Sequence, residues 1–175
     1  MSEPIMMLHG DSKLDRIDLR ILSQLQKKGR MTNVELAEAV GLSPSPCLTR
    51  VKRLEKAGYI AGYGAQIQIE KLGDVQIVFT EVTLADHRRE DFAKFEAAIR
   101  PVDEIVECHL ASGGYDYLLK FVTRSVHHYQ SVIEGLLERD IGIERYFSYV
   151  IMRTPFVKNG WPLEALFNSK ADSGV

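Results

Sequence analysis

Residues 32–58 read TNVELAEAVGLSPSPCLTRVKRLEKAG, and they predict two helices joined by a tight turn. Thr32 and Glu35 form a T-x-x-E capping box, in which each side chain can satisfy a backbone N–H at the start of a helix. Gly41 can adopt the left-handed conformation that ends a helix. Ser43 then caps the next helix and is followed by a proline at the first helical position, where the missing N–H is harmless. Two helices so closely spaced make a helix-turn-helix signature.

The apolar residues of this stretch predict how the helices pack. Ala37 is small enough to lie where the two helices cross, and Gly58 closes the second of them. Four residues of the second helix are expected to share its buried face, at about 100° per residue. They are Cys47, Leu48, Val51 and Leu54. Cys47 is thus expected to be a small buried hydrophobe rather than a redox switch.

The other face of the second helix carries short polar residues near its N-terminus and basic residues after them. That composition suits a helix placed N-terminus first in the major groove of DNA. The candidate DNA-binding residues are Ser43, Ser45, Pro46, Thr49, Arg50, Arg53 and Lys56. The basic charge is local, because the whole chain has a net charge of −2. A three-helix bundle whose polar face has no role stays open as an alternative.

A further helix precedes this pair, and a linking segment follows it. Asp15 can cap a helix whose apolar residues recur at helical spacing as far as Lys27 and Lys28. After the second helix of the pair, residues 59–64 lead into the alternating apolar residues of 65–69. This pattern predicts a short wing or linking strand that ends the DNA-binding part.

The pattern changes near residue 74 and predicts a sheet with two helices. The expected elements, in order, are a strand at 75–84, a helix at 88–100, strands at 105–111 and 116–123, a helix at 126–138 and a strand at 143–153. The order β-α-β-β-α-β is that of a ferredoxin-like domain. The first strand is apolar on both faces, so we expect a second copy of the chain to cover the face that the helices leave open.

Residues 112–116 read SGGYD and predict a glycine-rich turn that could bind a small polar ligand. The two glycines expose backbone N–H groups, and Asp116 adds a carboxylate. A free amino acid needs donors for its carboxylate and an acceptor for its ammonium group, and this turn offers both. On that interpretation, Asp116→Ala removes an acceptor while the turn keeps its fold. A tight hairpin in which Asp116 only satisfies local amides stays open as an alternative.

Both halves of the sequence resemble the Lrp/AsnC family of transcriptional regulators. The resemblance rests on LDRID at 14–18, VELAEAVGLSPSPC at 34–47, RVKRLE at 50–55 and GGYDYLL at 113–119. It covers about residues 13–153. It implies an α+β protein with an N-terminal winged helix-turn-helix and a C-terminal ferredoxin-like βαββαβ domain. It also implies dimers that can build into larger rings, such as tetramers or octamers.

The resemblance further implies where an effector binds, around the glycine-rich turn and the last strand. The candidate effector-binding residues are Gly113, Gly114, Tyr115, Asp116, Tyr149 and Val150. The chain is expected to divide into five parts. They are an N-terminal tail (1–12), a helix-turn-helix DNA-binding domain (13–62), a linking strand (63–73), a ferredoxin-like ligand-sensing and dimerisation domain (74–155) and a C-terminal tail (156–175). That last tail matches no pattern of the family.

The sequence lacks the motifs of an enzyme, a cofactor site or a metal site. It has no Walker A loop, no G-x-G-x-x-G and no C-x-x-C pair. The two cysteines are too few for a disulfide scaffold, which favours a reducing compartment. No apolar run approaches the ~20 residues that span a bilayer, and the first residues lack the basic leader of a signal peptide. We therefore expect a cytoplasmic protein without a membrane partner.

These observations predict a sequence-specific DNA-binding transcriptional regulator that responds to an amino acid or a related small metabolite. Its partners would be double-stranded DNA, a small-molecule effector and further copies of the chain. The alternative is a metabolite-sensing or assembly protein that does not bind DNA. Binding to DNA that weakens log-linearly with salt would separate the two, because phosphate contacts release counterions.

Overall fold

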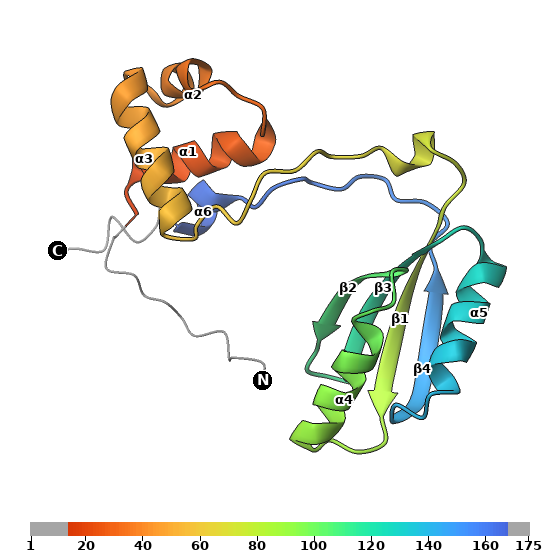
Figure 1. Cartoon of the computed structure of the whole chain (residues 1–175). Helices are drawn as coiled ribbons and strands as arrows, with labels where there is room; N and C mark the ends of the chain where they lie inside the picture. Colours follow the sequence, from red (N-terminus) through yellow and green to blue (C-terminus); the bar gives the residue numbers. More distant parts are fainter. Residues whose placement is uncertain (1–13, 168–175) are drawn as a thin grey trace. The chain divides into compact units, whose positions relative to one another are not determined.

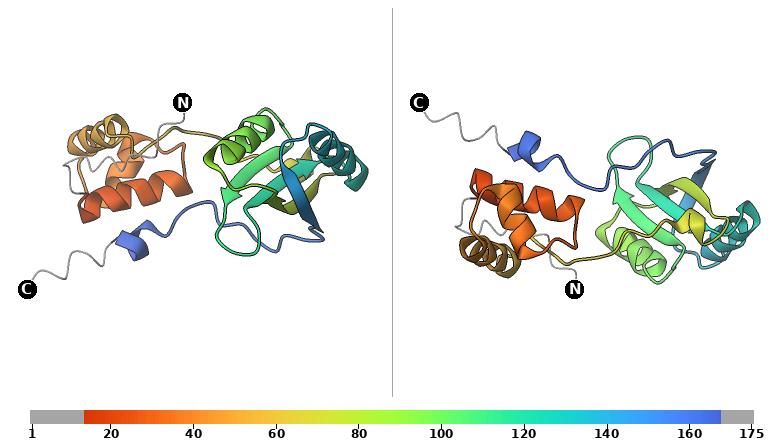
Figure 2. Two further views of the ribbon diagram at one scale, coloured as in Figure 1. Left: turned by 90° about the horizontal axis from the view of Figure 1, so that it is seen from below. Right: turned by 90° about the horizontal axis from the view of Figure 1, so that it is seen from above.

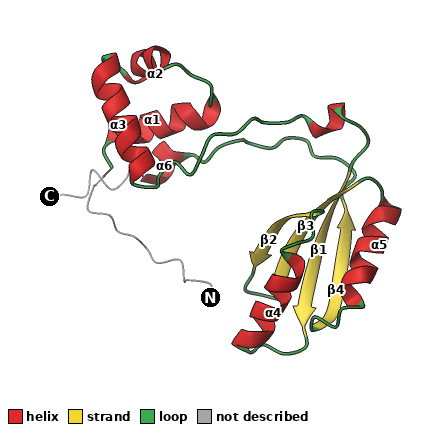
Figure 3. Ribbon diagram, in the orientation of Figure 1, coloured by secondary structure: helices red, strands yellow, loops and turns green. Residues whose placement is uncertain are grey.

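The computed structural model describes residues 14–167, which form two units (Figure 1). One unit combines the chain up to Gln66 with the segment that begins at Phe156, and the other spans Ile67–Pro155. The first unit is helical and the second contains the only sheet of the described residues (Figure 3). We call them the helical unit and the sheet unit. The expected N-terminal tail at 1–12 lies outside the described residues.

The helical unit begins with three helices whose ends follow from the sequence. They are α1 (Arg16–Lys27), α2 (Asn33–Val40) and α3 (Pro44–Lys56). At the start of α2, Thr32 Oγ1 accepts the Glu35 N–H at 3.2 Å and Glu35 Oε2 accepts the Thr32 N–H at 2.7 Å, so the expected capping box is confirmed. Gly41 ends α2 in the left-handed region, with φ 75°, as expected.

The core of the helical unit confirms most of the expected packing. Its buried residues are Ile21, Leu36, Ala37, Val40, Cys47 and Leu54. The expectation for Leu48 is wrong, because this side chain is 42% exposed. Cys47, Val51 and Leu54 already form one stripe at i, i+4 and i+7, and Leu48 lies about 100° away from Cys47 around the helix.

The linking strand expected at 63–73 does not form. These residues run as irregular chain, with a single 3₁₀ turn at Ile69–Lys71. Ile67 and Leu72 are 67% and 78% exposed. A strand needs a neighbour whose backbone completes the hydrogen-bond ladder, and an alternating pattern of side chains does not supply one.

The chain returns to the helical unit after the sheet. The short helix α6 (Leu163–Phe167) packs against α1. The Gln26 side chain makes two hydrogen bonds to one residue of this segment: Nε2 donates to the Trp161 carbonyl at 2.6 Å, and Oε1 accepts the Trp161 N–H at 2.9 Å. A Cβ at Gly160 would lie 3.0 Å from Gln26 Cδ, so only a glycine fits there without adjustment. We call residues 156–167 the C-terminal strap.

We expect Gln26→Ala to loosen the C-terminal strap without unfolding either unit. The variant loses both hydrogen bonds to Trp161, at a cost of about 1 kcal/mol, so the detached state becomes roughly fivefold more populated. Limited trypsin digestion should then cut faster at Lys158, which is exposed. Gln24→Ala, on the same helix, is the control and should leave the rate unchanged. Equal cleavage rates in the two variants would contradict the anchoring role of Gln26.

The sheet unit has the expected β-α-β-β-α-β order. Its elements are β1 (Gln76–Leu84), α4 (Arg89–Ile99), β2 (Ile105–Leu110), β3 (Tyr117–Thr123), α5 (Val126–Leu137) and β4 (Ile143–Val150). The strands pair antiparallel in the order β2-β3-β1-β4. Both helices lie on one face of the sheet (Figure 2). The chain is therefore an α+β protein with a ferredoxin-like domain.

The two faces of this sheet differ in burial. On β1, the side chains of Val78, Thr80, Val82 and Leu84 are buried beneath the helices, while the residues that alternate with them are only half-buried. The apolar residues on the other side are expected from strand alternation and from the register of β1 with β3 and β4. We call this set the outer sheet face: Ile77, Phe79, Leu118, Val122, Phe147 and Tyr149. Phe147 is 56% exposed and Tyr149 is 50% exposed, so this face lacks the cover that the helices give the inner one.

Candidate nucleic-acid and effector sites

The N-terminal part of α3 presents short polar residues to solvent. Ser43, Ser45, Pro46 and Thr49 are all exposed. Ser43 is the N-cap residue, but its side chain makes no capping hydrogen bond. The Thr49 hydroxyl donates to the Ser45 carbonyl at 3.1 Å, which fixes its orientation on the helix. These four side chains lie where the sequence placed them.

The orientation expected for the two arginines of α3 is wrong. Arg50 Nη1 lies 2.6 Å from Asp15 Oδ2 and 2.8 Å from Asp18 Oδ1, and Arg53 Nη2 lies 2.5 Å from Asp18 Oδ2. Both guanidinium groups therefore reach back to α1 rather than pointing away from the bundle. They can do so because Arg50 and Arg53 lie on the flank of α3, between the buried stripe and the outward face.

Within this ion-pair cluster, the pKa values of Asp15 and Arg50 are shifted. Partial burial raises the pKa of Asp15, but the hydrogen bond from the Asp18 N–H and the contact with Arg50 outweigh it, so the pKa lies below its ordinary value. The two carboxylates in turn raise the pKa of Arg50. Both residues are therefore charged at neutral pH, and the cluster of two carboxylates and two guanidiniums is balanced in charge.

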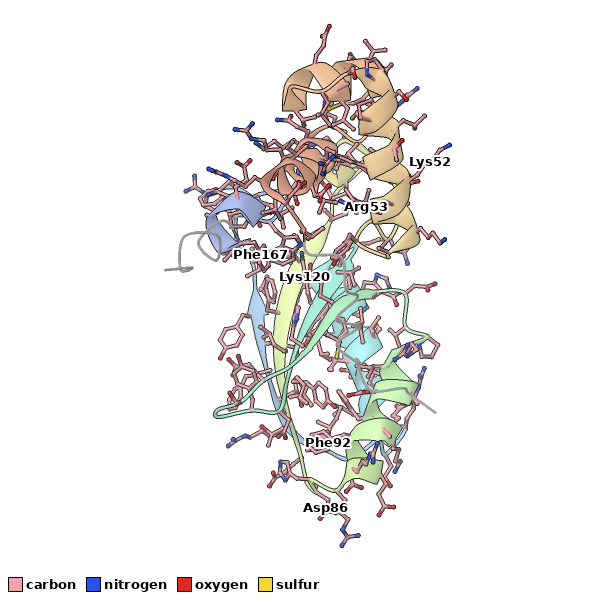
Figure 4. All side chains as sticks on the ribbon, turned by 90° about the vertical axis from the view of Figure 1, so that its left-hand side faces the viewer. Lys52, Arg53, Asp86, Phe92, Lys120 and Phe167 are labelled. Atoms are coloured by element: carbon pink, nitrogen blue, oxygen red, sulfur yellow. The ribbon has the colours of Figure 1, made fainter. Side chains whose placement is uncertain are left out.

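The face of α3 directly opposite the core includes Lys52, which is not among the DNA-binding candidates predicted from the sequence. At about 100° per residue, four residues lie around the side opposite Cys47 and Leu54. They are Ser45, Thr49, Lys52 and Lys56, and all four are exposed; we call them the α3 stripe. Figure 4 shows Lys52 projecting away from the unit, whereas Arg53 lies on the side towards α1. Because Lys52 can be placed on this face from its position around the helix, it could have been predicted from the sequence.

The glycine-rich turn joins β2 to β3 and is open to solvent. Its ends are held by two backbone hydrogen bonds: the Ala111 N–H donates to Asp116 O at 2.8 Å, and the Asp116 N–H donates to Val82 O at 2.9 Å. Gly113 has φ 151°, a conformation that other residues rarely adopt. Gly113 and Gly114 are exposed, so a small ligand can approach their backbone.

The Asp116 carboxylate is already engaged within the chain. Its Oδ2 accepts the Leu84 N–H at 2.8 Å and lies 3.1 Å from His87 Nε2. The Asp116 side chain is only 16% exposed. It therefore braces the end of β1 against the turn, which is the local role that the sequence left open as an alternative. Oδ1 remains available for a further hydrogen bond, because the bonds above use Oδ2.

The two candidate residues on β4 do not lie together. Tyr149 pairs with Phe79 on the outer sheet face, and its hydroxyl donates to Glu81 Oε2 at 3.1 Å, which raises the pKa of Tyr149. Val150, one residue later, belongs to the opposite face by strand alternation. The structure thus separates Val150 from Tyr149.

A residue that the sequence analysis missed reaches the turn instead. Arg145 Nη2 donates to the Gly114 carbonyl at 3.3 Å, and its guanidinium lies 6.0 Å from the centre of the Phe147 ring. Arg145 is opposite Thr83 on β1, close to the end of the strand that meets Asp116. It brings a positive charge to the turn beside the Asp116 carboxylate. Only the register of β4 with β1 shows this proximity.

The described residues contain neither a metal-binding cluster nor a membrane-spanning helix. Within residues 14–167, no three or more His, Cys, Asp or Glu side chains cluster in a way that could hold a metal ion. In the same range, every helix is too short or too polar to cross a membrane.

The chain combines a helix-turn-helix that has a polar, basic outer stripe with a ferredoxin-like domain that has a ligand-accessible turn. These two features together define a class of ligand-responsive DNA-binding regulators. Comparisons with known proteins agree. Residues 14–61 match the family model for winged helix-turn-helix DNA-binding domains, and residues 77–160 match that of the Lrp/AsnC ligand binding domain. The chain belongs to the Lrp/AsnC family of transcriptional regulators, and it is a regulator rather than an enzyme.

Individual relatives are also transcriptional regulators. The transcriptional regulatory protein DoeX of Halomonas elongata is 47% identical over 142 residues, which cover 81% of this chain and 90% of DoeX. The leucine-responsive regulatory protein of Escherichia coli K12 is 45% identical over 139 residues, 79% of this chain and 85% of the relative. The solved structure of a Neisseria meningitidis transcriptional regulator with L-Met superimposes with a TM-score of 0.81 at 32% identity, covering 88% of this chain and 99% of that one.

Proposed function

We propose that α3 is the recognition helix of this regulator and that the α3 stripe makes its central contacts with DNA. The observation that carries the proposal is the exposure of Ser45, Thr49, Lys52 and Lys56 on the side opposite the core. Short hydroxyl side chains near the N-terminus suit base edges, and lysines further along suit phosphates. Membership of the family favours this function over a metabolite-sensing or assembly protein that does not bind DNA.

The remaining candidates of α3 would act around this stripe. Ser43 and Pro46 lie at the exposed start of the helix, where a helix N-terminus favours phosphate. Arg50 and Arg53 flank the stripe, and both are held by carboxylates of α1. A guanidinium carries five N–H donors, so an arginine can bind a carboxylate and a phosphate or base together. The flanking arginines would therefore contact DNA while still bound to α1.

We propose an amino acid as the effector, bound at the glycine-rich turn. The relative of known structure with L-Met supports this class of ligand. The turn offers backbone N–H groups at Gly113 and Gly114, and Arg145 adds a cation for the ligand's carboxylate. Asp116 Oδ1 supplies an acceptor for its ammonium group, and Tyr115 and Tyr149 would border the ligand from the same side. Val150, which strand alternation turns to the other face, has no role in this proposal.

The outer sheet face would be the dimer interface. Its aromatic and aliphatic side chains are exposed in the single chain, and an apolar sheet face of this kind is stabilised by a symmetric partner. A two-fold dimer places two recognition helices against half-sites about 34–36 Å apart, which is one turn of DNA. Tetramers or octamers would be assemblies of these dimers.

Salt titration of lysine variants tests the recognition helix. We expect Lys52→Ala and Lys56→Ala each to weaken binding to all duplexes about equally, and to reduce the slope of log affinity against log salt by about one. Lys71→Ala, which removes the same charge from the sheet unit, is the control and should leave the slope unchanged. Unchanged slopes in both α3 variants would contradict the proposed contact surface.

A further inference from the structure

The Asp18 carboxylate is the most completely buried charge among the described residues. It lies in the first turn of α1, and the residue is 0% exposed. Each of its oxygens contacts a different arginine of α3: Oδ1 lies 2.8 Å from Arg50 Nη1, and Oδ2 lies 2.5 Å from Arg53 Nη2. One carboxylate on α1 thus holds two arginines of the neighbouring helix.

Helix capping does not account for this arrangement. Asp18 Oδ2 also accepts the Asp15 N–H at 3.1 Å and so completes a capping box at the start of α1. The same task is performed at the start of α2 by Glu35, whose side chain is 46% exposed. A capping box therefore forms without burial, and burying a carboxylate carries a desolvation cost that capping alone does not require.

The paired arginines lie beside the α3 stripe, on the helix that we assign to DNA recognition. An arginine that is not held can adopt many rotamers and can bind any nearby phosphate. An arginine held by a carboxylate has a fixed guanidinium plane, and its charge is partly neutralised. The first property favours recognition of a base with defined geometry, and the second weakens binding to DNA of arbitrary sequence.

We propose that Asp18 is a positioning residue for DNA recognition: by binding Arg50 and Arg53 together, it sets their geometry and suppresses their contacts with non-specific phosphates. Asp18 does not touch DNA itself. It increases the ratio between the affinities for the operator and for random DNA, rather than the affinity for DNA as such. The inference rests on the proposed role of α3.

The test compares Asp18→Asn with Asp15→Asn. Both changes remove one negative charge from the same capping box, and asparagine can replace aspartate at the N-cap of α1. Asp15 contacts Arg50 but is not the carboxylate that joins the two arginines. Affinities are measured for an operator selected from random duplexes by the wild-type protein and for a scrambled duplex, at a temperature well below the thermal transition of each variant.

We expect both variants to bind scrambled DNA more tightly, because each gains positive charge. Only Asp18→Asn should lose discrimination, with an operator-to-scrambled ratio lower by roughly tenfold, the size of one misplaced base contact. Equal ratios in the two variants would overturn the proposal and leave Asp18 a role in folding alone. A positioning role is thereby separated from a structural one, because lost stability lowers both affinities together.

A second variant covers the case in which Asp18→Asn does not fold. Arg53→Lys keeps the charge on α3 but replaces the planar fork by a point charge. It should lower the same ratio with little change in affinity for scrambled DNA, and an unchanged ratio would overturn the proposal. Failure of the recognition helix itself would be recognised separately, since the lysine variants would then leave the salt slope unaltered.

Discussion

Replacement of Phe147 by glutamate is expected to convert the protein into a monomer. Phe147 is 56% exposed on the outer sheet face, opposite Glu81 on β1. In a two-fold dimer the interface would bury two new carboxylates, one from each copy, each beside the existing Glu81 carboxylate. Arg145, whose guanidinium lies 6.0 Å from the Phe147 ring, can offset only part of this added negative charge. DNA binding would then fall by at least about 100-fold for a duplex with two half-sites, because the second contact would no longer be intramolecular.

Sedimentation or light scattering at micromolar concentration measures the first effect, and titration of a two-half-site duplex measures the second. Phe156→Glu is the matched control, since Phe156 is 75% exposed and lies in the C-terminal strap rather than on the sheet. This variant should keep the mass and affinity of the wild type. A dimeric mass for Phe147→Glu would contradict the assignment of the interface.

Asp116→Ala is expected to abolish the response to the effector and to destabilise the sheet unit. The Leu84 N–H would lose its acceptor at the end of β1, and His87 would lose its partner. A group left without its hydrogen bond costs about 1–3 kcal/mol. The structure thus adds a stability cost at the end of β1 that the sequence alone did not indicate. Thermal unfolding and isothermal titration with the twenty amino acids measure the two effects.

Asp116→Asn separates the two roles of this residue. The asparagine retains an oxygen for the Leu84 N–H but has no charge for the ammonium group of an effector. We therefore expect stability close to that of the wild type, with effector binding and the influence of the effector on DNA lost together, because coupling between two ligands is reciprocal. Wild-type effector affinity in both variants would show that Asp116 only braces the turn.

Much of the helical unit could be predicted because its signals are local. The capping box of Thr32 and Glu35, the left-handed Gly41 and the buried Cys47 each depend on a few neighbouring residues. The direction of Arg50 and Arg53 could not be predicted in the same way. A long side chain on the flank of a helix can point outward or back, and here a carboxylate on another helix decides the outcome.

The effector site shows the same limit. The turn itself follows from its two glycines, but Arg145 reaches it only through the register of β4 with β1, and register is a tertiary property. Strand alternation, which the sequence does contain, is enough to place Tyr149 and Val150 on opposite faces. The docking of the C-terminal strap on α1 depends on Gln26 and Trp161, which are far apart in the sequence and form no local pattern.

The position of α6 in the chain has a consequence for folding during synthesis. The helices α1, α2 and α3 leave the ribosome before the sheet unit, but α6, which packs on α1, follows only after the whole sheet unit. Until then, the apolar surface formed by Leu22, Leu25 and Tyr63, which Trp161 and Leu163 later border, stays open to solvent. The helical unit is thus begun before the sheet unit and completed after it, and its nascent form presents a surface that a ribosome-bound chaperone can hold.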